Sequence, residues 1–170
     1  AEAPDIRQVP AAPGSSAAAA SHQRLGEFVL SCEGDVPLLF TENETNHERL
    51  FPGQKNESPH VKDGINNCVV QGDQDAVSQE KQGTKVAAHY RFQVGGGQTE
   101  VIRLRLSKAS PDRKSKPFGK QFDEVFADRL READEFYKSV TPPSASEDAA
   151  NVMRQALAGM LWSKQFFYYD

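Results

Sequence analysis

Residues 86–106 read VAAHYRFQVGGGQTEVIRLRL, and this stretch has the most regular pattern in the chain. In its first half every second residue is apolar, which is typical of a half-buried strand. The three glycines at 95–97 supply the backbone freedom that a tight turn needs. In the second half Ile102, Leu104 and Leu106 share one face. The stretch therefore predicts a β-hairpin in the antiparallel sheet of a β-sandwich.

The residues before this stretch carry weaker strand signals. Short apolar runs at 27–32, 36–40 and 65–70 predict three further strands. The polar residues after the second run, 41–46, and the stretch 50–63 predict loops. Residues 1–24 are rich in alanine, proline, glycine and serine and have no period, so we expect a flexible leader there.

After residue 110 the apolar spacing becomes helical. The first helix carries its apolar face on Phe122, Val125, Phe126, Leu130, Ala133, Phe136 and Tyr137. Pro142 and Pro143 are expected to end it, and Ser144 with Glu147 forms a capping box for a final helix. That helix is apolar around most of its circumference, which predicts burial between other helices.

The end of the chain lacks the glycine, asparagine or proline that usually follows a helix. It finishes on the aromatic cluster Phe166, Phe167, Tyr168 and Tyr169, followed by Asp170. Ordinary termini are polar and frayed. We therefore expect the chain to be a piece of a longer protein, cut inside a helix that should be buried.

Composition excludes several classes of function. With 20 Lys and Arg residues against 24 Asp and Glu residues, the chain shows no clustered basic face for nucleic acid. No apolar run is long enough to span a membrane. Cys32 and Cys68 are too few to define a disulfide framework, so we expect free thiols and a cytoplasmic location.

Two clusters carry candidate binding residues. The loop cluster comprises Glu42, Asn43, Glu44, Asn46 and Glu48. Its carboxylates and amides can bind a cation or a polyhydroxyl ligand, and a solvated loop is the alternative. The tail cluster comprises Trp162, Phe166, Tyr168, Tyr169 and Asp170. It can stack on and hydrogen-bond a sugar, or it can be part of a helix core. The histidines have no metal-ligand spacing and no catalytic motif is present, so we expect no metal and no cofactor.

Several blocks of sequence resemble one enzyme family. They are LLFTENETN at 38–46, KDGI at 62–65, GTKVAAHY at 83–90, FDEVFA at 122–127, EADEFY at 132–137 and RQALAGMLWSKQF at 154–166. In this order they are similar to bacterial proteins of glycoside hydrolase family sixty-three. The resemblance covers residues 25–170.

The resemblance implies a fold and an activity. Members of the family have an N-terminal β-sandwich followed by an (α/α)6 barrel, and they hydrolyse α-glycosidic bonds, including α-glucosides, with inversion. Inversion needs a carboxylic acid and a carboxylate base. In the family both lie in the barrel, so we expect them beyond Asp170 and name no catalytic residue here.

The expected fold class is therefore α+β. An antiparallel β-sandwich portion at 25–110 precedes a linker and first long helix at 111–143. Residues 144–170 would start the truncated (α/α)6 barrel, with the missing barrel as their intramolecular partner.

The resemblance also suggests where a carbohydrate substrate would bind. Tyr168, Tyr169 and Asp170 would approach the barrel mouth. The loop residues Glu42, Asn43 and Asn46 would face the junction between sandwich and barrel. The alternatives are a non-catalytic carbohydrate-binding or structural β-module, and an interaction domain that docks its exposed helix on a partner.

Overall fold

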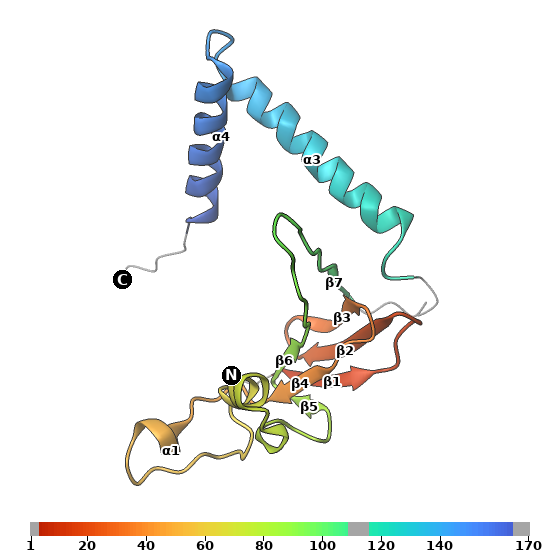
Figure 1. Ribbon diagram of the computed structural model, residues 1–170, viewed down its shortest axis with the longest axis vertical. Coiled ribbons are helices and arrows are strands. Elements are labelled where there is room, and N and C mark those ends of the chain that lie inside the picture. The colour runs from red at the N-terminus through yellow and green to blue at the C-terminus, as the bar shows by residue number, and fades with distance from the viewer. Residues whose placement is uncertain (1–3, 109–115, 165–170) are drawn as a thin grey trace. The chain divides into compact units, whose positions relative to one another are not determined.

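The computed structural model describes residues 4–108 and 116–164 (Figure 1). The chain divides into two compact units, Ala1–Phe118 and Gly119–Asp170. The first unit holds two antiparallel sheets and the second holds two long helices, so the fold class is α+β as expected. Among the described residues, no helix combines the length and the apolarity that crossing a membrane requires.

The described residues of the first unit form seven strands and four short helical turns. The strands are β1 (Asp5–Val9), β2 (Ser15–His22), β3 (Gly26–Glu33), β4 (Leu38–Thr41), β5 (Gln82–Gly83), β6 (Lys85–Ala88) and β7 (Leu104–Lys108). The helical turns are α1 (His47–Leu50), α2 (Gly64–Asn66), a π-helical turn (Asn67–Gln71) and a 3-10 turn (Gln74–Ala76). One sheet has the order β5-β1-β2-β3-β7, and the other consists of β4 and β6.

The core of this unit lies between the two sheets. Ala18 and Cys32 from the five-stranded sheet pack with Leu38 and Phe40 from β4, and all four are buried. The chain crosses from one sheet to the other between β5 and β6. A side chain at Gly83 would come within 2.5 Å of the Thr41 carbonyl oxygen, so this close crossing requires a glycine.

The prediction of a flexible leader at 1–24 is wrong. Residues 5–22 form the β1–β2 hairpin, and β2 pairs with β1 on one side and β3 on the other. Ala17 and Ala18 are 5% and 1% exposed. Small side chains give a weak strand signal, but a central strand is held by two ladders of backbone hydrogen bonds.

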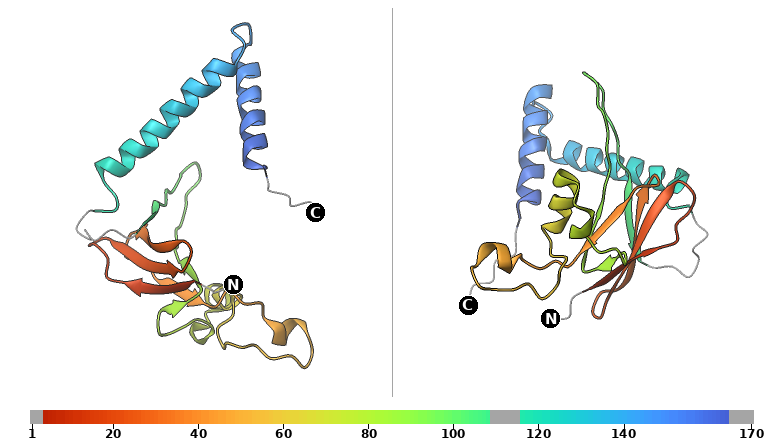
Figure 2. Two further views of the ribbon diagram at one scale, coloured as in Figure 1. Left: turned by 180° about the vertical axis from the view of Figure 1, so that it is seen from behind. Right: turned by 60° about the horizontal axis from the view of Figure 1, so that its bottom comes forward.

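The predicted hairpin at 86–106 is also wrong, although both of its strands exist in shortened form. β6 pairs with β4 and β7 pairs with β3, so the two belong to different sheets. The residues between them leave the sheets and return (green in Figure 2). The turn itself forms where the glycines predict it, since the Gln98 N–H donates to the Gly95 carbonyl oxygen at 3.1 Å.

Residues 65–70 form helical turns instead of the predicted strand. Ile65 and Cys68 are three residues apart, and both contribute to a second core cluster with Leu39 and Val77. A short apolar run satisfies helical and extended spacing equally well, and the surrounding core decides between them. The turns end at Gly72, which has a φ angle of 78°.

The second unit confirms the two predicted helices. They are α3 (Lys120–Val140) and α4 (Glu147–Trp162). The N-cap of α4 is Ser146 and not the predicted Ser144, because the Ala149 N–H donates to Ser146 Oγ at 3.2 Å. The helices contact each other through Arg154, whose guanidinium lies 2.7 Å from Asp134 and 4.7 Å from the ring centroid of Tyr137.

Candidate functional site

The predicted binding residues Glu42 and Asn43 lie in the loop that follows β4. Thr84, at the crossing between the sheets, forms a hydrogen bond with each of them. Its hydroxyl donates to Glu42 Oε2 at 2.6 Å and accepts from the Asn43 N–H at 2.7 Å. The Glu42 carboxylate is therefore already engaged, whereas Asn43 is exposed.

Asn46 uses its side chain to organise the same loop. Its Oδ1 accepts from the Arg49 N–H and from Asn56 Nδ2, both at 3.1 Å. Its Nδ2 donates to the two carboxylate oxygens of Asp63 at 3.2 and 3.1 Å. The amide thus has partners on both of its polar atoms, which makes Asn46 a structural residue in this conformation.

The loop therefore brings Glu42, Asn43 and Asn46 into one segment, with two of the three side chains bonded to protein. In the part of the chain that the structure describes, no group of three or more His, Cys, Asp or Glu side chains is placed to hold a metal ion. The other predicted binding residues, Tyr168, Tyr169 and Asp170, lie outside the described residues.

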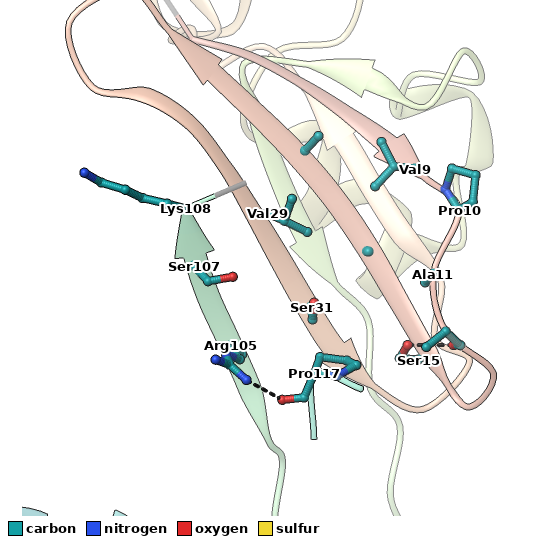
Figure 3. A pocket seen from close by; sticks show the side chains of 13 residues that line it. Val9, Pro10, Ala11, Ser15, Val29, Ser31, Arg105, Ser107, Lys108 and Pro117 are labelled. Carbon is teal, nitrogen blue, oxygen red and sulfur yellow. Dashed lines mark hydrogen bonds between the residues drawn. The ribbon is translucent and has the colours of Figure 1, made fainter. Parts of the chain in front are cut away.

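A different site is present on the outer face of the five-stranded sheet, which is the face away from β4 and β6. It is a groove of about 350 Å³ (Figure 3). The residues that line it are Val9, Pro10, Ala11, Ala12, Ser15, Ala17, Ala19, Val29, Ser31, Arg105, Ser107, Lys108 and Pro117. Of the predicted binding residues that the structure describes, none lines this groove.

The register of the strands builds the floor of the groove. Directly paired residues in neighbouring antiparallel strands point to the same side of a sheet. The pairs Val9–Ala17, Ala17–Ser31 and Ser31–Arg105 therefore form one row across β1, β2, β3 and β7. Small side chains on β2 leave the middle of this row hollow, between larger side chains at its two ends.

Arg105 joins the groove to the segment that follows β7 in the chain. Its Nη1 donates to the carbonyl oxygen of Pro117 at 3.1 Å (Figure 3). On the opposite side the Ser15 hydroxyl donates to the carbonyl oxygen of Ala12 at 2.7 Å. A hydrogen bond thus holds each of the two walls.

The chemistry of the lining residues suits binding and not acid–base catalysis. None of the lining residues that the structure describes is an aspartate, glutamate, histidine or cysteine. A serine nucleophile needs an adjacent base, and an inverting hydrolase needs two carboxyl groups. The groove offers neither, but it does offer hydroxyl groups and one guanidinium.

A paired charge lies in the next row of the same face. Arg103 Nε donates to Glu33 Oε2 at 2.6 Å, and this hydrogen bond lowers the pKa of Glu33. The Arg103 guanidinium also lies 5.9 Å from the ring centroid of Phe118. Arg103 therefore links β3 to the residue that precedes the helical unit.

The core behind this pair contains two groups whose pKa values are raised. Burial raises the pKa of the Cys32 thiol. Burial also raises the pKa of Tyr90, and electrostatic interactions with Cys32 and Glu33 raise it further. The Tyr90 hydroxyl donates to the carbonyl oxygen of Glu33 at 2.6 Å, so it has a structural partner.

The sequence contained one signal for the groove. Arg105 and Ser107 alternate with Leu104 and Leu106 in β7, which predicts a polar face on that strand. The polar face is half-buried in the structure, while the two leucines are 49% and 66% exposed. The polar side of β7 is therefore its more enclosed side.

Comparison with known proteins gives one informative match. The chain is 40% identical over 148 residues to a Saccharomyces cerevisiae protein described as "Uncharacterized protein YMR196W". The aligned region covers 80% of this chain and 13% of the yeast protein, so the chain spans about one eighth of that relative. No model of a protein family matches the chain, and no solved structure matches it.

Proposed function

We propose that this chain is a non-catalytic part of an inverting α-glycosidase that acts on α-glucosides or related oligosaccharides in the cytoplasm. The observation that carries the proposal is that the blocks of sequence similar to the family fall on strands where a sandwich is expected and on helices where the later helical part is expected. Residues 38–46 and 83–90 include β4 and β6, and residues 122–137 lie in α3. Residues 154–162 lie in α4, which would be the first helix of the (α/α)6 barrel.

The catalytic acid and base would then lie outside residues 1–170, in the rest of the barrel. The groove supports a catalytic site elsewhere, because none of its described lining residues carries a carboxyl group. The yeast relative supports it too, since 87% of that protein lies outside the aligned region and leaves room for a barrel. The buried thiols Cys32 and Cys68 are consistent with a reducing compartment.

Activity measurements on the chain and on its long relative test this proposal. We expect the 170-residue chain to show no turnover of maltose, kojibiose or nigerose. We expect the complete yeast protein to hydrolyse at least one of them and to release the product in the inverted anomeric form, which proton NMR detects directly. Turnover by the 170-residue chain would contradict the placement of the acid and base. Retention of configuration would contradict the reaction class.

A second function has one observation in its favour. The described residues of the groove include hydroxyl groups and a guanidinium, which can hydrogen-bond a sugar, and no acid–base pair, as a carbohydrate-binding module without catalysis would. In that case the 170-residue chain alone would bind an oligosaccharide such as maltotriose saturably. Calorimetric titration of the chain with this sugar separates the two functions, because a non-catalytic part of a glycosidase does not need to bind sugar by itself.

A further inference from the structure

We propose that the groove on the outer face of the five-stranded sheet binds a small organic anion with an aliphatic body, of which a medium-chain monocarboxylate is the simplest form. This inference goes beyond the proposed glycosidase and does not depend on it, because it concerns a different ligand at a site that the proposed catalysis does not use.

The floor of the groove selects the aliphatic body. Val9, Ala17, Ala19 and Val29 lie on the outer face of three adjacent strands, and their side chains are purely aliphatic. None of the lining residues in the described part of the chain is aromatic, so the apolar contacts that the groove offers come from aliphatic side chains. A volume of about 350 Å³ is at the small end of ligand sites, which span about 300–1,000 Å³.

The charge of the groove selects an anion. The chain as a whole has a net charge of −4, yet none of the described residues that line the groove is acidic. Two cationic residues line the described part of the groove, Arg105 and Lys108. Lys108 pairs with Phe28 on the other face of the sheet and its side chain extends away from the groove (Figure 3), so Arg105 is the better placed of the two to contact a ligand. Two carboxylates lie one row beyond the floor in the register. Glu33, on the side of Arg105, is paired with Arg103, whereas the exposed Glu27 lies beyond Val29.

The fixed position of the Arg105 guanidinium suits the binding of a carboxylate. Its Nη1 hydrogen bond to Pro117 fixes the guanidinium against the wall of the groove. A guanidinium has five N–H donors, so this one hydrogen bond leaves others for a bidentate contact. Ser31 and Ser107 flank Arg105 across β3 and β7 and add hydroxyl donors.

Titration of the 170-residue chain with octanoate, followed by NMR, tests the proposal. We expect saturable binding that weakens at least about tenfold in Arg105→Gln, because the charge-assisted hydrogen bonds are lost. Octanol, which has the same body without the charge, should also bind at least about tenfold more weakly. Ala19→Leu should weaken binding by filling the floor while Arg105 stays intact. Arg24→Gln, an exposed change in the turn between β2 and β3, is the matched control and should bind as the wild type does.

Four outcomes would overturn the proposal. They are the absence of saturation by octanoate, an Arg105→Gln affinity equal to that of Arg24→Gln, equal affinity for octanol and octanoate, and binding of inorganic phosphate as strong as that of octanoate. If Arg105→Gln loses its fold by circular dichroism, the octanol and Ala19→Leu measurements decide, since both keep the arginine. Binding of octanoate without any glycosidase activity in the yeast relative would support this inference and count against the proposed function alone.

Discussion

Glu33 and Arg103 show how a surface charge pair can have a structural role. Their side chains are 34% and 36% exposed, so solvent screens the attraction and the pair adds only modestly to stability. Its geometry matters more, because the Glu33 N–H also donates to the Arg103 carbonyl oxygen at 3.1 Å. The two contacts fix the chain where it enters β7, immediately before Arg105.

The lowered pKa of Glu33 predicts a pH dependence of stability. A carboxyl group whose pKa is lowered by folding stabilises the protein above its unfolded pKa, about 4.3, and this contribution is lost as pH falls through the folded pKa. We therefore expect the melting temperature of the wild type to fall more steeply below about pH 4.3 than that of Glu33→Gln. Glu27→Gln, an exposed change at the start of β3, should follow the wild type. Parallel profiles for wild type and Glu33→Gln would contradict the role of this pair.

The burial of the two cysteines predicts that their thiols react slowly in the native protein. Cys32 is 0% exposed and Cys68 is 5% exposed, and burial raises the pKa of Cys32. Since the thiolate is the reactive form, native labelling by a disulfide reagent should be at least about a hundredfold slower than labelling in denaturant. An introduced Lys85→Cys, at an exposed position of β6, should react at the denatured rate and serves as the control. Rapid labelling of either native cysteine would show that the core opens.

At the level of elements, local patterns predicted strands better than they predicted partners. The alternation in residues 86–106 does contain β6 and β7, but alternation says only that one side of a strand is apolar. Which strand pairs with which depends on contacts far apart in sequence. β7 pairs with β3, about 75 residues earlier, through the register Leu30–Leu106.

The difference between local patterns and contacts that are distant in sequence also explains which parts of the candidate site could be predicted. The loop after β4 was predicted because its polar residues are adjacent in sequence. The groove was not, because Val9, Ala17, Ser31 and Arg105 form one row only after four strands have paired. β2 was missed for a related reason, since an alanine-rich segment becomes a strand only between two neighbours.

The contact between α3 and α4 includes Arg154, so removal of this side chain should loosen α4. Its ion pair with Asp134 and its position over Tyr137 should together contribute about 1 kcal/mol. We therefore expect Arg154→Ala to raise the rate of amide hydrogen exchange in α4 about fivefold, measured by NMR. Arg131→Ala removes ion pairs that lie within α3, to Asp128 and Glu135, and is the matched control. If both variants change α4 equally, Arg154 does not anchor the helix.

At the scale of the whole molecule, each unit leaves apolar surface uncovered. In the first unit the two-stranded sheet packs on β2 and β3, and the leucines of β7 remain exposed. In the second unit both helices expose apolar side chains. Those more than half exposed are Val125, Phe126, Leu130, Phe136, Val152, Met160, Leu161 and Trp162. Single exposed apolar residues are ordinary, but groups of this kind mark surfaces that bind another apolar surface.

These surfaces predict that the 170-residue chain associates with itself. Light scattering should show an apparent mass that rises between micromolar and millimolar concentration, because association with another chain removes the exposed apolar faces of the helices from water. The double variant Leu130→Glu and Leu161→Glu should lower this mass, since it places a charge on each helix at a position more than 60% exposed. Val69→Glu, at an exposed apolar position in the first unit, is the control and should leave association unchanged. A constant monomer mass for the wild type over the whole range would show that the helical faces do not drive association.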